Sequence, residues 1–354
     1  MHSFKCYIFN FIFFIITLSV SSNPLAQADG YDRAMWVWEQ STRDALYSPS
    51  QNQELLNFSQ TKDIKTLYLY SDSYLGINDI IERPDYYRYF ISEAHSRGMQ
   101  VHALLGSMYL QTWEYILPEK REDALSMVRN VLEYNQNSSA SEKFDGFNVD
   151  IEPYLLSDWG DNQPYYSEQY LDALSAQKQL VINSGQNIEY GPCIPRWYDE
   201  VSLIQNITWN GEVKPLYQHL QDIGSYVTIM DYVNDADGIV NNASDELQYA
   251  DSINRKVVIG VETQDVIPSW TTFYGFSEEE MEAVLNAAEG NLKNYTSYDG
   301  FAIHSYDSYA KMAVIPEPGN IILLGLGLIG LFAFRRKRKS ISYIDKLYFC
   351  GILI

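Results

Sequence analysis

Between residues 34 and 306, this chain repeats one pattern eight times: a short run rich in β-branched and aromatic residues, then a stretch with apolar residues at helical spacing. The runs are residues 34–38, 66–71, 99–106, 146–152, 188–195, 226–232, 257–263 and 300–306. Eight alternations of strand and helix in about 250 residues are what a closed barrel of parallel strands requires. The chain is therefore predicted to be an α/β protein with a single-domain (β/α)8 fold, a TIM barrel.

An open, doubly wound sheet is the competing architecture for the same alternation. Such sheets usually carry a glycine-rich phosphate-binding loop after the first strand. The segment around the end of the first run, WVWEQSTRD, contains no glycine, so the barrel is the better interpretation. Among the helical stretches, Gly98 predicts the end of one helix, and Ser277 with Glu280 predicts a capping box that starts another.

The first 28 residues have the parts of a secretory signal peptide. Lys5 precedes a long apolar run, and the small residues of LAQA predict a cleavage site after Ala28. Residues 29–315 then form the exported domain, which is long enough to bury one large core.

The C-terminal tail joins three features within residues 316–339: a Pro-Glu-Pro motif at 316–318, an apolar segment at 321–334 and a basic cluster at 335–339. The apolar segment has 14 residues, fewer than the ~20 of a spanning helix, so we expect its contact with a membrane to be marginal or transient. The basic cluster predicts that this end stays on the cytoplasmic side, with the preceding domain outside.

This tail resembles the PEP-CTERM sorting signal of Gram-negative bacteria that make extracellular polysaccharide. The resemblance implies recognition by a sorting enzyme of the exosortase type in the membrane. We therefore expect export across the inner membrane, followed by anchoring or by release to the cell surface or extracellular matrix. Residues 340–354 continue past the basic cluster, where such signals usually stop, and the sequence indicates no role for them.

The net charge of the chain limits its possible partners, and its cysteine content limits its possible disulfide and metal sites. The 46 acidic residues outnumber the 25 Lys and Arg residues and give a net charge of −21, which makes nucleic acid and anionic membrane surfaces unfavourable partners. Cys6 and Cys350 lie in the terminal segments, which leaves Cys193 as the one cysteine of the exported domain. An internal disulfide and a cysteine metal cluster are therefore excluded there, and no His and carboxylate spacing indicates zinc. We predict no metal and no cofactor.

The fourth run, DGFNVDIE, places polar and apolar side chains on opposite faces. Strand side chains alternate with a period of two, so Asn148, Asp150 and Glu152 share one face. The apolar face consists of Phe147, Val149 and Ile151. Buried carboxyl groups without partners are costly, so the polar row is a candidate site. Burial beside a second carboxylate raises the pKa of a glutamate, which suits Glu152 as a general acid.

Functional residues of such a barrel lie at the C-terminal ends of its strands. The last residues of the runs, and tryptophans in the segments after them, are therefore candidates for substrate binding. They are Trp38, Asp72, Asn148, Trp197, Asp231, Glu262, Trp270, His304 and Tyr306, beside Asp150, Glu152 and Tyr232. Flat aromatic rings suit the apolar faces of sugar rings, so the tryptophans favour a carbohydrate cleft.

The fourth run resembles the D-x-x-D-x-D-x-E signature of the family eighteen glycoside hydrolases, the chitinases and endo-β-N-acetylglucosaminidases. It matches at Asp145, Asp150 and Glu152, and IMDY at 229–232 is similar to the Met and Tyr of their sixth strand. The resemblance implies that Glu152 protonates the glycosidic oxygen. It also implies that Asp150 orients the substrate's 2-acetamido group, which attacks the anomeric carbon, and that Tyr232 hydrogen-bonds this group. An exported, retaining hydrolase of polysaccharide with N-acetylated amino sugars is the resulting expectation.

Two positions depart from that pattern. Asn148 stands where the family has its middle Asp, and His304 with Tyr306 stands where its eighth strand has Trp. Asn148 can still donate a hydrogen bond to Asp150. The departures leave open a second class of function, a non-catalytic surface protein that binds carbohydrate in the same cleft.

A different enzymatic mechanism would pair Glu152 with Glu262, at the end of the seventh run. Barrel glycosidases of another clan place an acid on strand four and a nucleophile on strand seven, with carboxyl groups about 5 to 5.5 Å apart. That clan usually has Asn directly before its acid, whereas this chain has Ile151 there.

Overall fold

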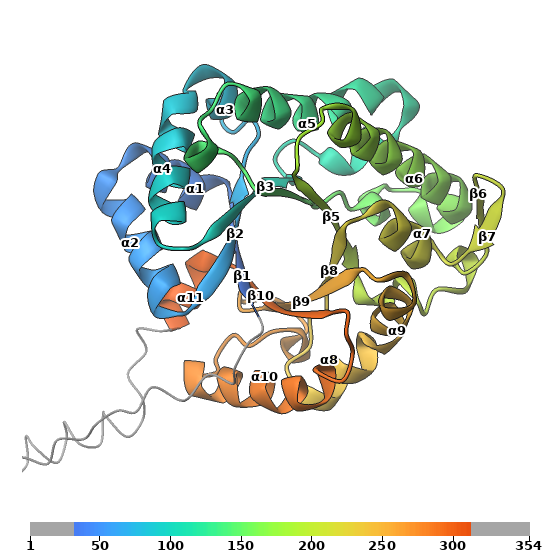
Figure 1. The fold of residues 1–354 in the computed structure, drawn as a ribbon. Helices are drawn as coiled ribbons and strands as arrows, with labels where there is room; N and C mark the ends of the chain where they lie inside the picture. The colour runs from blue at the N-terminus through green and yellow to red at the C-terminus, as the bar shows by residue number, and fades with distance from the viewer. Residues whose placement is uncertain (1–31, 313–354) are drawn as a thin grey trace, which may run out of the picture. The chain divides into compact units, whose positions relative to one another are not determined.

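The computed structural model describes residues 32–312, and these form a closed barrel of eight parallel strands (Figure 1). Consecutive barrel strands are neighbours, and β10 pairs with β1 to close the ring. The strands are β1 Arg33–Val37, β2 Ile64–Tyr70, β3 Gln100–Leu105, β4 Gly146–Val149, β5 Glu189–Pro195, β8 Tyr226–Met230, β9 Lys256–Glu262 and β10 Tyr298–His304. The predicted (β/α)8 TIM barrel is confirmed, and each of the eight runs overlaps one strand.

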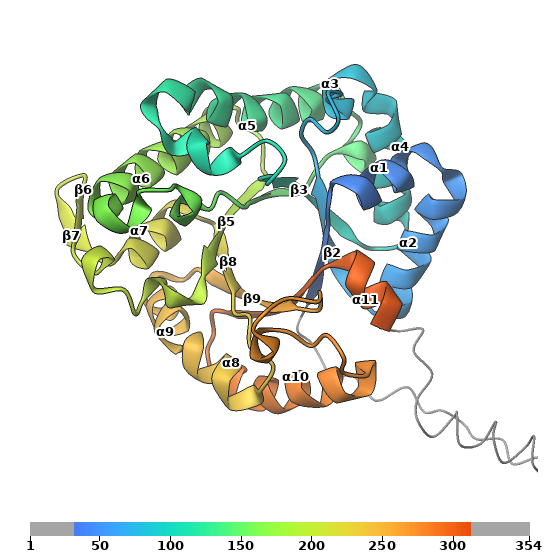
Figure 2. The ribbon, with the colours of Figure 1, turned by 180° about the vertical axis from the view of Figure 1, so that it is seen from behind.

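Helices surround the barrel on its outer side (Figures 1 and 2). The α-helices are α1 Glu39–Tyr47, α2 Pro49–Thr61, α3 Asp79–Glu82, α4 Pro84–Ser96, α5 Arg121–Gln136, α6 Trp159–Asn183, α7 Leu216–Ile223, α8 Ala236–Asn242, α9 Ser244–Ile253, α10 Glu278–Leu292 and α11 Tyr306–Met312. Short 3-10 helices lie in the connections, at Thr112–Ile116, Pro118–Lys120, Ala140–Glu142, Pro153–Leu155, Arg196–Tyr198, Ser202–Ile204 and Ser269–Thr271.

The sequence signals for helix ends are confirmed, and one small element was not predicted. Ser277 and Glu280 form the capping box that opens α10, and Gly98 takes a positive φ just after α4. A two-stranded antiparallel hairpin, β6 Ile207–Trp209 with β7 Glu212–Lys214, forms a separate sheet before α7. Strands of three residues are too short to leave an alternating pattern that can be recognised in the sequence.

Alternation along the strands separates two buried layers. Phe147 and Val149 of β4 belong to the larger core between the barrel and the helices, whereas Asn148 points into the barrel. A second, smaller cluster fills the barrel interior around Trp36 and Tyr68. Side chains thus occupy the interior, as in other eight-stranded barrels, so a ligand binds at an end of the barrel.

Three strands end two or three residues earlier than the sequence pattern predicts, and two of these are β4 and β8. β4 ends at Val149, three residues before the end of its run, and β8 ends at Met230, two residues before the end of its run. Asp150 still donates its backbone N–H to the Leu105 carbonyl at 2.6 Å, but the chain then turns into the 3-10 helix Pro153–Leu155. The candidate side chains of these runs therefore lie on the first residues of the connecting loops.

The terminal segments lie outside the described residues. These segments comprise the signal peptide at 1–28, the sorting tail at 316–339 with its apolar segment 321–334, and residues 340–354. Domain boundaries at 29–315 remain a prediction for the same reason. Among the helices of residues 32–312, none combines the length and the apolarity needed to cross a bilayer.

Asn148 ties four strands together inside the barrel. Its Oδ1 accepts a hydrogen bond from Trp36 Nε1 on β1 at 3.0 Å and one from Cys193 Sγ on β5 at 3.1 Å. Its Nδ2 donates to Thr228 Oγ1 on β8 at 3.1 Å. The side chain of Asn148 is completely buried. A partner that lost its hydrogen bond to Asn148 would therefore stay removed from water without compensation, at the full cost of its desolvation free energy. An amide suits the position because it accepts and donates at once.

We predict that Asn148→Ala lowers the free energy of unfolding by about 2–4 kcal/mol, because it leaves the buried Trp36 N–H and the Thr228 hydroxyl without this partner. Urea unfolding followed by circular dichroism measures the change. Asn241→Ala removes the same group from an exposed position of α8 and should cost less than about 0.5 kcal/mol. Equal losses in the two variants would contradict the role assigned to Asn148.

Candidate active site

A cavity of about 200 Å³ opens at the C-terminal end of the barrel. Its walls come from the loops after β1, β3, β4 and β8 and from the last residue of β10. The lining residues are Trp38, Glu39, Ser107, Met108, Thr112, Trp113, Asp150, Glu152, Tyr232 and His304. Five residues predicted from the sequence are brought together here: Trp38, Asp150, Glu152, Tyr232 and His304.

The backbone of Asp150 is pressed against the end of β3. Its N–H donates to the Leu105 carbonyl at 2.6 Å, and its own carbonyl oxygen would lie 2.0 Å from a Cβ added at Gly106. Gly106 also adopts a φ of 142°, a conformation that side chains disfavour. Glycine at 106 therefore allows the approach that places Asp150 in the cavity wall.

The carboxyl groups of Asp150 and Glu152 share the cavity and favour the protonated form. Burial, followed by the charge of Glu152, raises the pKa of Asp150 well above its ordinary value. Burial also raises the pKa of Glu152, although a hydrogen bond from Tyr154 opposes the rise and a positive charge on His304 would oppose it too. The pair therefore retains a proton at a higher pH than ordinary carboxyl groups do, which is what a general acid requires.

An aromatic group on the same loop orients Glu152. The hydroxyl of Tyr154 donates to Oε1 of Glu152. The Tyr154 ring packs edge-on against Trp197, with centroids 5.2 Å apart, and against Tyr198, with centroids 6.4 Å apart. Trp197, a predicted binding residue, is not among the lining residues of the cavity and instead buttresses the ring that holds Glu152.

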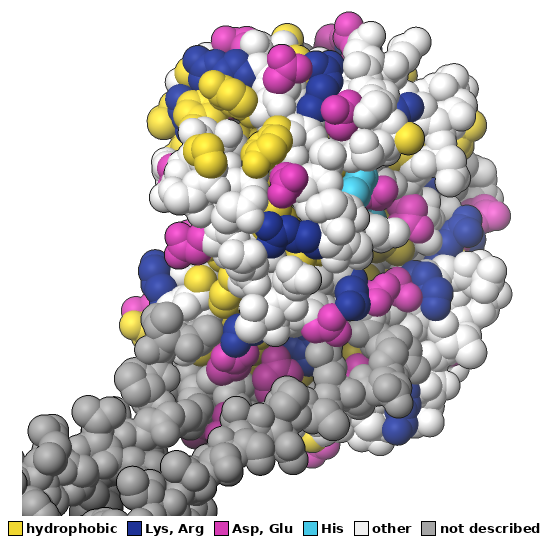
Figure 3. Space-filling model, turned by 60° about the vertical axis from the view of Figure 1, so that its left-hand side comes forward, with side chains coloured by type: hydrophobic (Ala, Val, Ile, Leu, Met, Phe, Trp, Pro, Cys, Tyr) yellow, Lys and Arg dark blue, Asp and Glu magenta, His cyan; other side chains and the backbone are white. Residues whose placement is uncertain are grey.

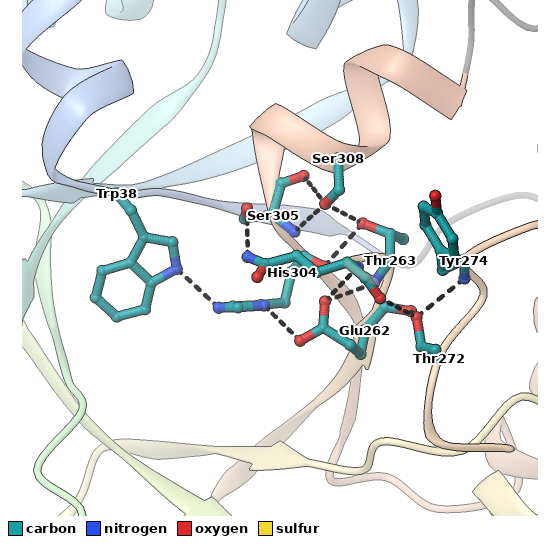
Figure 4. Close-up of polar contacts among 9 residues, drawn as sticks. Trp38, Glu262, Thr263, Thr272, Tyr274, His304, Ser305 and Ser308 are labelled. Atoms are coloured by element: carbon teal, nitrogen blue, oxygen red, sulfur yellow. Dashed lines mark hydrogen bonds and ion pairs between the residues drawn. The ribbon is translucent and has the colours of Figure 1, made fainter. Parts of the chain in front are cut away.

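His304 lies between Trp38 and Glu262 (Figure 4). Trp38 Nε1 donates to His304 Nε2 at 2.7 Å, and His304 Nδ1 lies 2.9 Å from Oε2 of Glu262. An indole N–H can only donate, so Nε2 must be the acceptor and the imidazole proton must sit on Nδ1. His304 is therefore neutral in this arrangement and donates to Glu262. Protonation of Nε2 would break its bond to Trp38.

Both carboxylate oxygens of Glu262 are occupied. Oε1 accepts the backbone N–H groups of Thr263 at 2.7 Å and Gln264 at 2.6 Å, and Oε2 accepts from His304. The side chain is only 4% exposed and is not among the lining residues of the cavity. Glu262 therefore acts on the cavity through the imidazole of His304.

Tyr232 forms the wall beside His304, with ring centroids 5.8 Å apart. It follows β8, and the preceding inward residue, Met230, belongs to the cluster inside the barrel. Burial raises the pKa of the Tyr232 phenol well above its ordinary value, so its O–H remains a hydrogen-bond donor.

Asn148 does not use its amide for the hydrogen bond to Asp150 that the sequence allows. Within residues 32–312, the side-chain amide of Asn148 donates to Thr228. The reason is that β4 ends at Val149, so Asp150 leaves the line of the strand while Asn148 stays inside the barrel. Oδ1 of Asp150 is buried and has no hydrogen-bond partner in the described part of the chain.

Three other predicted residues lie outside the cavity lining. Asp72 accepts a backbone N–H of its own loop at 2.7 Å, and burial raises its pKa to about 6. Asp231 faces the helices, where Asn242 of α8 donates to its Oδ1 at 2.7 Å. Tyr306 packs edge-on against Phe58, with ring centroids 5.5 Å apart.

Trp270 also lies outside the cavity, on the loop after β9. It is 51% exposed, and the Arg196 guanidinium carbon lies 5.6 Å from its ring centroid. An exposed aromatic ring on this face of the barrel remains available to a sugar ring.

Five lining residues were not among the candidates predicted from the sequence: Glu39, Ser107, Met108, Thr112 and Trp113. Two of them could have been predicted from their position in the sequence, because Glu39 directly follows the first run and Ser107 directly follows the third. Trp113 belongs to the 3-10 helix Thr112–Ile116, which carries its ring back to the cavity. No spacing in the sequence indicates that return.

The tail and the barrel each resemble known proteins. Residues 314–338 match the family model of the PEP-CTERM protein-sorting motif, which confirms the motif predicted from the Pro-Glu-Pro sequence and its basic cluster. A GH18 chitinase from Pseudoalteromonas aurantia has a similar structure, with 13% identity, a TM-score of 0.52, and coverage of 78% of this chain and 95% of the chitinase chain.

A second solved structure is the C-terminal domain of a protein assigned as a chitinase in Desulfitobacterium hafniense DCB-2. It shares 13% identity at a TM-score of 0.51, over 78% of this chain and 93% of that domain. No curated protein sequence matches this chain. At this level of identity, the likeness shows that the chain shares the barrel fold of these proteins.

Buried acids behind the cavity make stability depend on pH. Burial raises the pKa of Asp231 from 3.8 to about 7 and that of Asp199 to about 6. Oδ2 of Asp231 is buried without a hydrogen-bond partner within residues 32–312. The folded chain therefore holds protons on these two acids that the unfolded chain has already released, so their contribution to the free energy of unfolding falls as pH rises from about 4 to about 7.

We predict that Asp231→Asn reduces this fall in stability between pH 5 and pH 7.5 by about 1 kcal/mol or more, because the amide cannot ionise. Urea unfolding at the two pH values measures the difference. Asp237→Asn, at an exposed position of α8, makes the same replacement at the surface and should leave the slope unchanged. An Asp231→Asn variant whose stability changes with pH as the wild type's does would contradict the assignment.

Proposed function

We propose that the protein is an exported glycoside hydrolase that acts on polysaccharide containing N-acetylated amino sugars. One observation carries the proposal: the buried carboxyl groups of Asp150 and Glu152, both with raised pKa values, line one cavity together with Tyr232. Such a pair provides an acid that keeps its proton to a higher pH than an ordinary carboxyl group, next to a hydrogen-bond acceptor for the substrate. The signature in the fourth run and the barrel fold shared with a GH18 chitinase support the same conclusion.

In the proposed reaction, Glu152 gives its proton to the glycosidic oxygen as the bond to the anomeric carbon breaks. The carbonyl oxygen of the substrate's own 2-acetamido group attacks the anomeric carbon, while Asp150 accepts a hydrogen bond from the acetamido N–H. Tyr232 donates its O–H to the same group. Water then displaces the acetamido oxygen with Glu152 as the base, and two displacements retain the configuration.

The surroundings of the two carboxyl groups fit these roles. Asp150 lines the cavity, and its Oδ1 is a buried acceptor with no hydrogen-bond partner within residues 32–312, which supports a role in accepting the substrate's N–H. A positive charge on His304 would lower the pKa of Glu152. The hydrogen bond from Trp38 keeps Nε2 of His304 unprotonated and so helps Glu152 to keep its proton. His304 is therefore a positioning residue in the proposed mechanism.

The two-glutamate alternative requires Glu262 as a free nucleophile. Its Oε1 accepts two backbone N–H groups, its Oε2 accepts from His304, and the side chain does not line the cavity. A nucleophile needs an oxygen exposed to the anomeric carbon. The arrangement around Glu262 therefore favours attack by the substrate's acetamido group.

A non-catalytic carbohydrate-binding protein is the second candidate function, and Asn148 is the observation that favours it. The amide has no proton to share with Asp150, and it is bound to Trp36, Cys193 and Thr228. Without that exchange, Asp150 has less help in changing its charge during a reaction cycle. The same cavity would then hold a glycan without cleaving it.

The sorting motif at 314–338 supports export and placement at the cell envelope of a Gram-negative bacterium. We propose that an exosortase-type enzyme processes the tail and that residues 321–334 contact the membrane at least transiently. Such a location would bring the barrel to extracellular polysaccharide, the class of partner that the cavity fits.

Glu152→Gln is expected to lower kcat/KM on a chromogenic N-acetylglucosamine oligomer by about 100-fold or more, because the amide has no proton to give to the leaving oxygen. Release of the chromophore measures the rate. Glu54→Gln, an exposed position on α2, makes the same replacement far from the cavity and should retain the wild-type rate. Hydrolysis that survives in Glu152→Gln would disprove the catalytic assignment.

The nature of the nucleophile is tested with an oligomer that lacks every acetamido group. Substrate assistance predicts no cleavage of this oligomer, since the attacking oxygen is missing. Cleavage of it, together with an inactive Glu262→Gln, would favour the two-glutamate mechanism instead. Tight binding of acetylated glycans with no product by mass spectrometry would favour the carbohydrate-binding protein.

A further inference from the structure

We infer that the substrate is a partly deacetylated amino-sugar polymer and that Glu39 binds the free ammonium group of one of its sugars. The inference rests on the proposed function, which places an acetylated sugar at the reacting position. It adds the charge of the neighbouring sugar and names the residue that recognises it.

The lining of the cavity is acidic. Its carboxyl groups belong to Glu39, Asp150 and Glu152, and no Lys or Arg of residues 32–312 lines it. On the outer flank in Figure 3, by contrast, Lys and Arg side chains are interspersed with Asp and Glu side chains. The absence of cations is therefore a property of the cavity rather than of the whole surface. Such a lining disfavours uronic acid polymers and favours saccharides that carry positive charge.

Glu39 is held in a fixed position at the cavity wall. It is the first residue of α1, and Ser107 Oγ on the loop after β3 donates to its Oε1 at 2.7 Å. Ser107 is itself fixed, because its N–H donates to Thr112 Oγ1 at 2.8 Å and its Oγ accepts the N–H of Tyr109 at 3.1 Å. Within the described part of the chain, Oε2 of Glu39 has no hydrogen-bond partner. A fixed carboxylate with one free oxygen suits a charged N–H donor.

The three carboxyl groups have separate tasks in the proposed reaction. Asp150 accepts the acetamido N–H and Glu152 supplies the proton, which leaves Glu39 for another group of the substrate. Because the acetamido oxygen is the nucleophile, the reacting sugar has to be acetylated. An ammonium group bound by Glu39 therefore belongs to an adjoining sugar, and a chain with both kinds of sugar is partly deacetylated.

The test compares two oligomers of equal length, one fully N-acetylated and one partly de-N-acetylated. We expect the wild type to have a kcat/KM about tenfold higher for the partly deacetylated oligomer, as one charge-assisted hydrogen bond would give. Glu39→Gln should bring this ratio close to one, and raising the salt concentration should lower it in the wild type. Glu279→Gln, at an exposed position of α10, removes the same charge from the surface and should preserve the ratio.

A binding measurement separates this inference from the proposed hydrolysis. In Glu152→Gln, calorimetry with the same two oligomers should show tighter binding of the partly deacetylated one, and adding Glu39→Gln should remove the difference. Hydrolysis of the fully acetylated oligomer without any preference would overturn the inference and leave the proposed function standing. A binding preference that depends on Glu39, with no hydrolysis of either oligomer, would support the inference and overturn the hydrolase.

Discussion

Burial of two neighbouring carboxyl groups at the end of β4 is the constraint on which the candidate site depends. Asp150 and Glu152 leave the strand just where the barrel opens, so each is largely removed from water while still facing the cavity. Ionising both would place two like charges in a poorly solvated space. The pair therefore retains a proton at a higher pH than ordinary carboxyl groups do, and its neighbours are arranged around that requirement.

Two hydrogen-bond networks next to Asp150 and Glu152 add no charge to the cavity. Asn148 supplies a neutral amide where a carboxyl group would add a third titrating group, and it also joins the strands beneath. The hydrogen bond from Trp38 to Nε2 of His304 keeps this imidazole neutral. The carboxylate of Glu262 accepts hydrogen bonds from backbone N–H groups and from the imidazole. His304 and Glu262 therefore satisfy each other's hydrogen bonds beside the cavity, whereas Oδ1 of Asp150 has no hydrogen-bond partner within residues 32–312.

Much of this arrangement could be predicted from the sequence, and there is a physical reason for each feature that could not. The eight strands follow from period-two runs between helical stretches, and the row at Asp150 and Glu152 follows from the same alternation. The partner of Asn148 could not be predicted, because it depends on Thr228 lying across the barrel at the same level. The position of Glu39 after the first run could have been predicted, but its bond to Ser107 could not, because it depends on the three-dimensional return of the β3 loop.

The close contact between Gly106 and the backbone of Asp150 connects the side of the cavity that carries Asp150 to the side that carries Glu39. The backbone of Asp150 is bonded to Leu105, and the next residues along that chain lead directly to Ser107 and its bond to Glu39. A displacement of the loop after β3 would therefore move the carboxyl group of Asp150 and the cavity rim at Glu39 together. Under the proposed mechanism, a sugar held at Glu39 would steady the same loop that positions Asp150 beside the neighbouring sugar.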